Sequence, residues 1–95
     1  MLIHDLLARA RDRTGANSER ALARMIGVGP VSLRRYRAGH GLPSKIQMLK
    51  ISQAAGITPE AGLVLLNMWR SDGEARTIYR SMWQKLVSNA DQTYQ

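Results

Sequence analysis

Three arginines lie on a short segment between two glycine-containing turns. They are Arg34, Arg35 and Arg37, within MIGVGPVSLRRYRAGHGLPS, residues 25–44. A guanidinium group is a planar fork of N–H donors, and it bonds bidentately to phosphate oxygens or to the O6 and N7 atoms of guanine. The chemistry that this segment predicts is therefore the binding of an anion or of a nucleic-acid base.

The excess positive charge lies in the same half of the chain. The formal net charge is +7, and residues 1–50 hold ten lysines and arginines against three acidic residues, whereas residues 51–95 hold four of each. This asymmetry favours a polyanionic partner that the first half contacts. Charge alone is equally consistent with a solvated surface that keeps the protein soluble.

Residues suited to catalysis or metal binding are sparse. His4 and His40 are far apart in the sequence, and neither a nucleophile–base pair nor a pair of carboxylates stands out. The chain has no cysteine, which excludes disulfides and thiolate zinc sites and suits an intracellular protein. We therefore expect no enzyme, no metal, no cofactor and no small-molecule substrate.

Length and hydropathy bound the class of protein. Ninety-five residues, 44% of them apolar, suffice for one small domain. No run of about 18 apolar residues occurs, and the N-terminus lacks the basic-then-apolar order of a secretion signal. We expect a cytoplasmic protein without a membrane partner.

Helices must hold the arginine segment, and the sequence predicts helices throughout. Apolar residues recur at helical spacing, no strand pattern occurs, and capping residues divide the chain into five or six short helices. The first expected helix ends at Thr14-Gly15. The next three run from Ser18 to Gly27, from Pro30 to about Ala38, and from Ser44 to Gly56. The fifth begins at Thr58-Pro59, and the sixth begins at a capping box of Ser71 and Glu74. The fold class is therefore all-α.

The second and third of these helices are joined by only three residues, Gly27–Gly29. Such a short connection forces the two helices to cross steeply, and Gly27 permits the backbone turn. In the third helix Leu33 is the expected inward anchor, while Arg34 and Arg35 project outward. This arrangement would hold the arginines rigidly, as the reading of bases requires.

Several residues in SERALARMIGVGPVSLRRYRAGHGLPS and MLKISQAAGIT have the types and the spacing of a known sequence motif. They are the small residue Ala23, the turn glycine Gly27, the pair Leu33 and Tyr36, the closing Gly39, and Pro43-Ser44. With them, residues 15–57 resemble the helix-turn-helix of the lambda repressor and Cro-like (XRE-type) family. The C-terminal MWRSDGEARTIYRSMWQKL also resembles the end of small regulators from filamentous phages and prophages.

The resemblance implies a five- to six-helix domain with separate regions for DNA binding and assembly. Residues 1–57 would bind double-stranded DNA, residues 58–88 would complete the core and dimerise, and residues 89–95 would form a flexible tail. The residues that would contact bases are Val31, Ser32, Arg34 and Arg35, with Arg35 as the better base reader.

A second set of residues is expected to contact the DNA backbone. It consists of Ser18, Arg20, Arg24, Tyr36, Arg37, His40, Ser44 and Lys45. For some of them an alternative stays open: Tyr36 suits the core, Arg37 an intramolecular pair, and Arg20 and Arg24 plain solvation.

Three departures from the family pattern affect these contacts. Pro30 stands where a glutamine is frequent, which removes a hydrogen-bonding reader and leaves Val31 to contact a thymine methyl group. Glu19 also replaces a frequent glutamine, and its carboxylate would repel phosphate unless Arg20 or an arginine of the third helix pairs with it. Arg37 replaces the usual acidic residue before the end of that helix.

Apolar side chains in the last two helices are candidates for a dimer interface. They are Leu66, Trp69, Ile78, Met82, Trp83 and Leu86. The core is their simplest location, but a chain of this size cannot bury every face of both helices. Pairing across a two-fold axis would bury the surplus and would match a palindromic operator with half-sites about 34 Å apart.

We therefore expect a sequence-specific, double-stranded DNA-binding transcriptional regulator at the bacterial nucleoid, a phage or prophage repressor that acts as a homodimer. Two alternatives stay open. One is a protein-interaction module, an antitoxin or phage factor that holds a host protein through its C-terminal helices. The other is an accessory protein that bends DNA for excision or replication.

Overall fold

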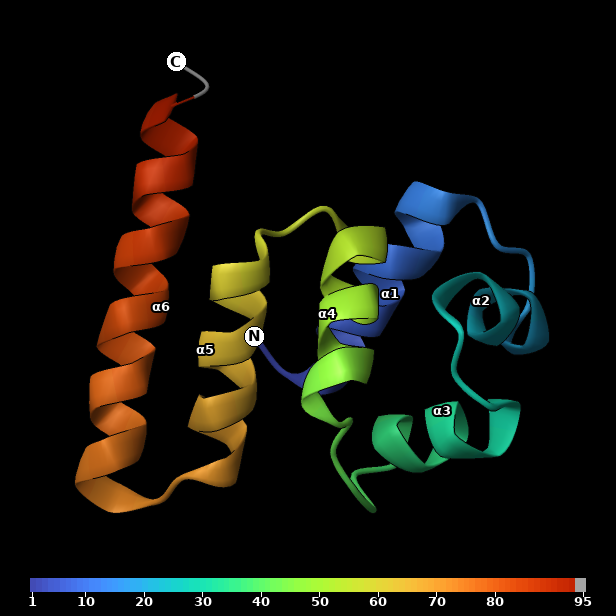
Figure 1. Cartoon of the computed structure of the whole chain (residues 1–95), viewed down its shortest axis with the longest axis horizontal. Coiled ribbons are helices and arrows are strands. Elements are labelled where there is room, and N and C mark those ends of the chain that lie inside the picture. The colour runs from blue at the N-terminus through green and yellow to red at the C-terminus, as the bar shows by residue number, and fades with distance from the viewer. Residues whose placement is uncertain (94–95) are drawn as a thin grey trace.

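Six helices form the fold in the computed structural model, which describes residues 1–93 and their side chains as far as residue 88 (Figure 1). They are α1 (Ile3–Thr14), α2 (Glu19–Ile26), α3 (Pro30–Arg37), α4 (Lys45–Ala55), α5 (Pro59–Arg70) and α6 (Gly73–Thr93). No strand occurs in residues 1–93. The prediction of an all-α fold with five or six helices is confirmed.

Hydroxyl groups cap the start of three helices, as the sequence predicts. The side chains of Ser18, Ser44 and Thr58 accept hydrogen bonds from the backbone amides three residues later, at 3.1 to 3.2 Å. Such a cap satisfies an amide that has no partner within its helix, and is typically worth about 1 kcal/mol. The starts of α2, α4 and α5 are therefore fixed locally.

The start and the end of α6 differ from the prediction. The expected capping box of Ser71 and Glu74 does not form: no hydrogen bond joins these two described residues, and the hydroxyl of Ser71 donates to the carbonyl of Asn67 at 2.6 Å, at the end of α5. The last helix begins at Gly73 instead. It continues to Thr93, so most of the expected tail at 89–95 is helical, and residues 94 and 95 lie outside the described residues.

The core lies between α1, α4 and α5, with α2 and α3 at one end of the molecule and α6 at the other (Figure 1). Its fully buried side chains include Leu6, Leu7, Leu22, Leu33, Met48, Ile51, Leu65 and Leu66. Burying one such side chain contributes about 1.5–3 kcal/mol relative to leaving it exposed. Because Leu22 and Leu33 belong to this core, α2 and α3 are held against a rigid support.

Gly62 lets α5 approach α4 closely. A Cβ atom at this position would overlap the hydroxyl of Ser52, which is buried and donates to the carbonyl of Met48 at 2.7 Å. We therefore expect Gly62→Ala to lower the free energy of unfolding by about 1–3 kcal/mol. In most helices this substitution stabilises, by up to about 1 kcal/mol.

Denaturant unfolding measures this effect. Gly41→Ala is the matched control, because nothing lies within 4 Å of the carbon that it adds. A Gly62→Ala variant as stable as the parent chain would show that α4 and α5 are not packed as closely as described.

Candidate nucleic-acid interface

The turn between α2 and α3 is closed by backbone hydrogen bonds. Gly27 has a left-handed backbone (φ 69°), and the amide of Val28 donates to the carbonyl of Ala23 at 2.9 Å. The side chain of Val28 is buried in the core. Pro30 then occupies the first position of α3, where a missing N–H costs no hydrogen bond. The direction in which α3 leaves the turn is therefore fixed.

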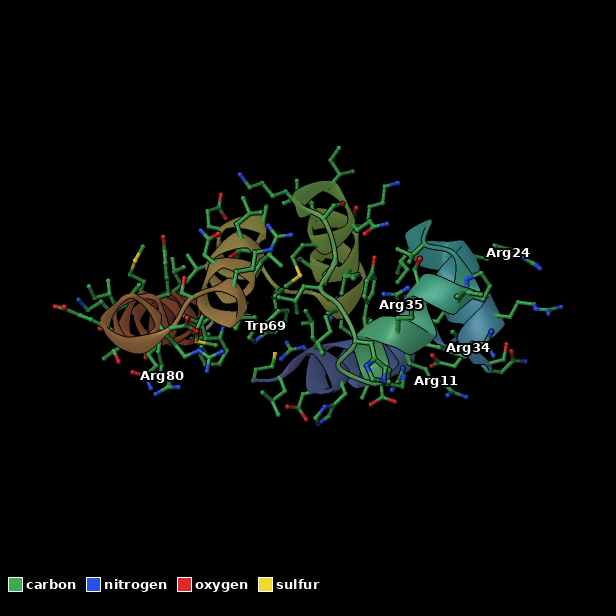
Figure 2. The ribbon with its side chains drawn as sticks, turned by 90° about the horizontal axis from the view of Figure 1, so that it is seen from below. Arg11, Arg24, Arg34, Arg35, Trp69 and Arg80 are labelled. Carbon is green, nitrogen blue, oxygen red and sulfur yellow. The ribbon has the colours of Figure 1, made fainter. Side chains whose placement is uncertain are left out.

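The two sides of α3 differ sharply. Leu33 and Tyr36 point into the core, while Arg34 and Arg35 are exposed and Val31 is 62% exposed. Figure 2 shows α3 from below, with Arg34 and Arg35 on it. Ser32 is half-buried at the flank. The structure thus brings together, on the outer side of one helix, the four side chains that the sequence assigns to base contacts.

The guanidinium groups of this outer face are largely uncommitted. Among the described residues, the side chain of Arg34 makes no hydrogen bond, and that of Arg35 makes one long hydrogen bond, from its terminal nitrogen to the carbonyl of His40 at 3.4 Å. A guanidinium group offers five N–H donors. Both side chains therefore retain donors for an external acceptor.

Gln47 links the start of α4 to α3. Its side-chain oxygen accepts from the hydroxyl of Tyr36 at 2.7 Å and from the backbone amide of Ser44 at 3.0 Å. This link holds Ser44 and Lys45, both exposed at the start of α4, in a fixed relation to α3. Local sequence patterns do not predict the contact with Tyr36, because it joins residues 11 positions apart, whereas the capping box of Ser44 and Gln47 is local.

Tyr36 is a core residue rather than a surface contact. Its side chain is only 8% exposed, and its hydroxyl donates to Gln47. The structure therefore moves Tyr36 from the set expected to contact the DNA backbone to the set that positions it. The alternative interpretation of Tyr36, as part of the core, is the one that the structure supports.

Arg37 is paired within the molecule. Its Nε donates to one carboxylate oxygen of Glu19 at 3.2 Å, and a terminal nitrogen donates to the other at 2.6 Å. This bidentate pair joins the end of α3 to the start of α2, and each side chain is about one-third exposed (33% and 30%). The pair neutralises the carboxylate of Glu19. It also engages Arg37 in an intramolecular pair, the alternative to a phosphate contact that the sequence left open.

The remaining candidates for backbone contacts lie at the edges of this surface. Ser18 is exposed at the start of α2, as is His40 in the segment after α3. Arg20 and Arg24 are exposed along α2, and Figure 2 shows Arg24 at the side of the domain. An amide-rich helix start carries partial positive charge, which suits a phosphate.

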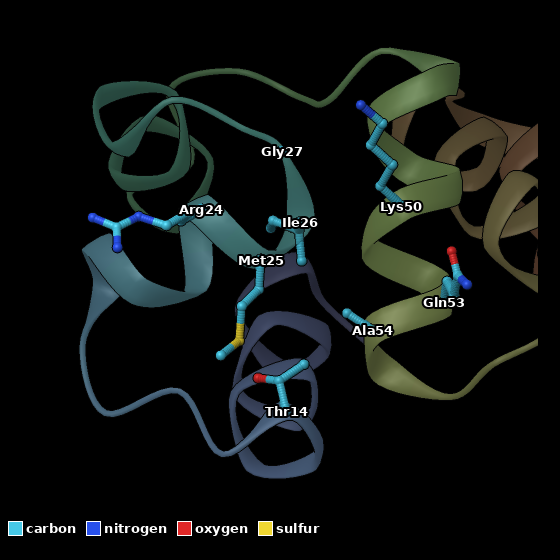
Figure 3. A pocket seen from close by; sticks show the side chains of 8 residues that line it. All are labelled: Thr14, Arg24, Met25, Ile26, Gly27, Lys50, Gln53 and Ala54. Atoms are coloured by element: carbon cyan, nitrogen blue, oxygen red, sulfur yellow. The ribbon is translucent and has the colours of Figure 1, made fainter.

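A surface groove of about 450 Å³ lies between α2 and α4 (Figure 3). Its lining includes the cations Arg24 and Lys50 and the 57% exposed side chain of Met25, and it holds no carboxylate. Within the described residues, no group of three His, Cys, Asp or Glu side chains is arranged to hold a metal ion. No helix in this part of the chain is long and apolar enough to cross a membrane.

The residues expected at a dimer interface fall into three groups. Leu66 is fully buried in the core, so its assignment to a dimer interface is wrong. Trp69 is half-buried, and its Nε1 donates to the carbonyl of Met1 at 3.1 Å. Trp83 and Leu86 are also half-buried, whereas Ile78 and Met82 are 54% and 43% exposed.

Comparison with known proteins identifies the family. The family model described as Helix-turn-helix matches residues 7–61, and comparison with curated proteins and with solved structures finds no match. The matched residues run from α1 into α5 and include α2, the turn, and the arginine-bearing α3. The chain belongs to the lambda repressor-like (XRE-type) helix-turn-helix family of DNA-binding regulators.

Proposed function

We propose that this protein is a sequence-specific transcriptional repressor that binds a palindromic operator in double-stranded DNA as a homodimer. The observation that carries the proposal is the outer face of α3, where Arg34 and Arg35 are exposed on a helix that Leu33 anchors in the core. In the major groove, an arginine bonds bidentately to guanine. Val31, 62% exposed, would contact a thymine methyl group, and Ser32 a base edge.

Contacts with the sugar-phosphate backbone would fix the register of α3 on the duplex. Ser18 at the start of α2, and Ser44 and Lys45 at the start of α4, lie on either side of α3 along the chain. His40 and Arg20 would add contacts at the margins. Such contacts carry no sequence information themselves, but they orient the helix that reads the bases.

The homodimer is proposed from the surface of α6. Among the helices in the described residues, α6 contacts only α5. Ile78 and Met82 lie four residues apart on this helix, so they share a face, and more than two-fifths of each side chain is exposed. A second copy related by a two-fold axis would bury Ile78 and Met82 of both protomers at once.

The position of α6 affects the expected operator. This helix and α3 lie at opposite ends of a molecule that measures 34 Å in its two larger dimensions (Figure 1). A dimer formed through α6 would therefore place its two α3 helices farther apart than one helical turn of DNA, about 34 Å. This revises the one-turn spacing expected from the sequence, and it predicts an operator with two well-separated half-sites.

Repression would follow from occupation of the operator, which excludes RNA polymerase. The resemblance of residues 68–86 to small regulators of filamentous phages supports phage or prophage genes as the targets. Selection of bound fragments from a random duplex library tests the proposal. We expect an enriched inverted repeat, whereas no enrichment would contradict sequence-specific binding, and a single asymmetric site would contradict the two-fold dimer.

Lys45→Ala is expected to weaken binding to operator and random DNA alike, because a lysine that contacts phosphate does not read sequence. The slope of log K against log salt concentration should become shallower by about 0.9 for each protomer, which loses one phosphate contact. Titrations at several salt concentrations measure both effects. Arg80→Ala, which removes an exposed cation from the side of α6 away from Ile78, is the control with the same charge change. A loss confined to the operator would exclude a pure backbone role for Lys45.

A further inference from the structure

We infer that Glu19 limits non-specific DNA binding by holding Arg37 in an ion pair. The inference rests on the proposed function, because it concerns the same surface. Arg34, Arg35 and Arg37 are consecutive or nearly so on α3, but only Arg37 is bound to a carboxylate among the described residues. The pair thus removes one cation from the surface next to the base-reading face and leaves that face unchanged.

The location of the pair separates it from the base-reading residues. Arg37 is at the end of α3 and is two-thirds buried, whereas Arg34 and Arg35 are exposed. Glu19 is the first residue of α2, immediately after the Ser18 cap, where a phosphate contact is proposed. Both charges therefore lie at the margin where the DNA backbone would pass, and a bidentate pair there presents little net charge to it.

The contribution of this pair to stability is expected to be small. Partly exposed ion pairs contribute little to folding, because solvent screens the attraction and two long side chains must be held in one geometry. The pair is expected to affect DNA affinity more than folding stability, because each cation that contacts a phosphate releases counterions and strengthens binding to any sequence. A carboxylate at this margin therefore acts mainly on the balance between specific and non-specific binding.

Release of Arg37 by Glu19→Gln tests the inference directly. Glutamine keeps the size of the side chain and removes the charge that holds the guanidinium group. For each protomer that contacts random DNA, we expect about fivefold tighter binding at 0.15 M salt and a salt slope steeper by about 0.9, as one added phosphate contact predicts. The operator should gain less, because base contacts already fix the register of α3, so the ratio of operator to random affinity should fall.

A second variant reverses the effect from the other side of the pair. Arg37→Gln leaves the carboxylate of Glu19 unpaired at the start of α2, where it should repel phosphate and weaken binding to random DNA. Adding Glu19→Gln to Arg37→Gln should restore the affinity for random DNA to near the parent value. This recovery by the double variant is a result that a merely structural pair would not produce.

Glu60→Gln is the matched control, because it makes the same charge change at the start of α5, on the opposite side of the molecule from α3 (Figure 1). Thermal melts establish that each variant is folded before its binding is compared. If Glu19→Gln and Glu60→Gln shift the salt slope equally, the inference is overturned. Failure of the parent protein to bind any duplex would instead refute the proposed function, so the two failures are distinguishable.

Discussion

Arg35→Ala is expected to reduce affinity by about 5- to 150-fold for each half-site of the operator, since one good bidentate contact with a base is worth about 1–3 kcal/mol. Affinity for random DNA should fall only slightly, because that complex loses one charge and no base contact. The expectation follows from the position of Arg35 on the outer face of α3, where its single hydrogen bond within the chain is long, at 3.4 Å.

Competition binding with the selected operator and a scrambled duplex measures the two affinities separately. Arg80→Ala is the matched control, because Arg80 is an exposed arginine on α6, at the other end of the molecule from α3 (Figure 2). The stability of both variants should stay within about 0.5 kcal/mol of the parent protein, as is usual for exposed positions. Equal loss on both duplexes would show that Arg35 contacts only the backbone.

Ile78→Asp is expected to convert the dimer to a monomer. A carboxylate at this position would appear twice in a two-fold interface, and burying an unpaired charge is strongly unfavourable. Because each half-site then binds separately, affinity for the full operator should fall by about 100- to 10,000-fold, the usual gain from linking two binding units. Affinity for a single half-site should not change.

Light scattering coupled to size-exclusion chromatography measures the assembly state, and titration of full and half operators measures the loss of linkage. Gln84→Asp is the control, because it adds the same charge at an exposed position of α6 that lies about 120° around the helix from Ile78. A parent protein that is monomeric at micromolar concentration, with an operator affinity that Ile78→Asp leaves intact, would contradict the dimer. That result would favour the protein-interaction module, because the apolar face of α6 would then be open to another protein.

The parts of the fold that were predictable from the sequence depend on signals within a few residues. Gly27 ends α2, Pro30 begins α3, and Ser44 caps α4, and each of these features follows from local backbone geometry. The outward direction of Arg34 and Arg35 follows from the same local information, because Leu33 beside them is the expected inward anchor. The core of the candidate interface was therefore predictable.

Contacts between distant segments were not predictable from local patterns. Glu19 and Arg37 are 18 residues apart, and either Arg20 or an arginine of α3 was a possible partner for Glu19 until α2 and α3 were placed side by side. Ser71 lies between two helices, and its hydroxyl serves the end of α5 rather than the start of α6. Local signals do not decide between two such competing partners.

The assignment of apolar residues to core or interface also required the tertiary arrangement. The sequence of α5 is apolar on most sides, so Leu66 and Trp69 were both reasonable interface candidates. Packing of α5 against α4 and α6 leaves Leu66 completely buried, whereas Ile78 and Met82 on α6 stay exposed. Which face of a nearly uniform apolar helix becomes buried depends on its neighbours rather than on its own periodicity.

The most direct measurement of the central claim is methylation interference at guanine N7, an atom that lies in the major groove and that an arginine of α3 would contact. The selected operator is methylated sparsely, and the bound and free fractions are compared guanine by guanine for the parent protein and for Arg35→Ala. We expect methylation at symmetry-related guanines in both half-sites to block the parent protein, and sensitivity at one guanine of each half-site to disappear in the variant. Binding that is indifferent to N7 methylation at every guanine would contradict the claim that α3 reads sequence in the major groove through its arginines.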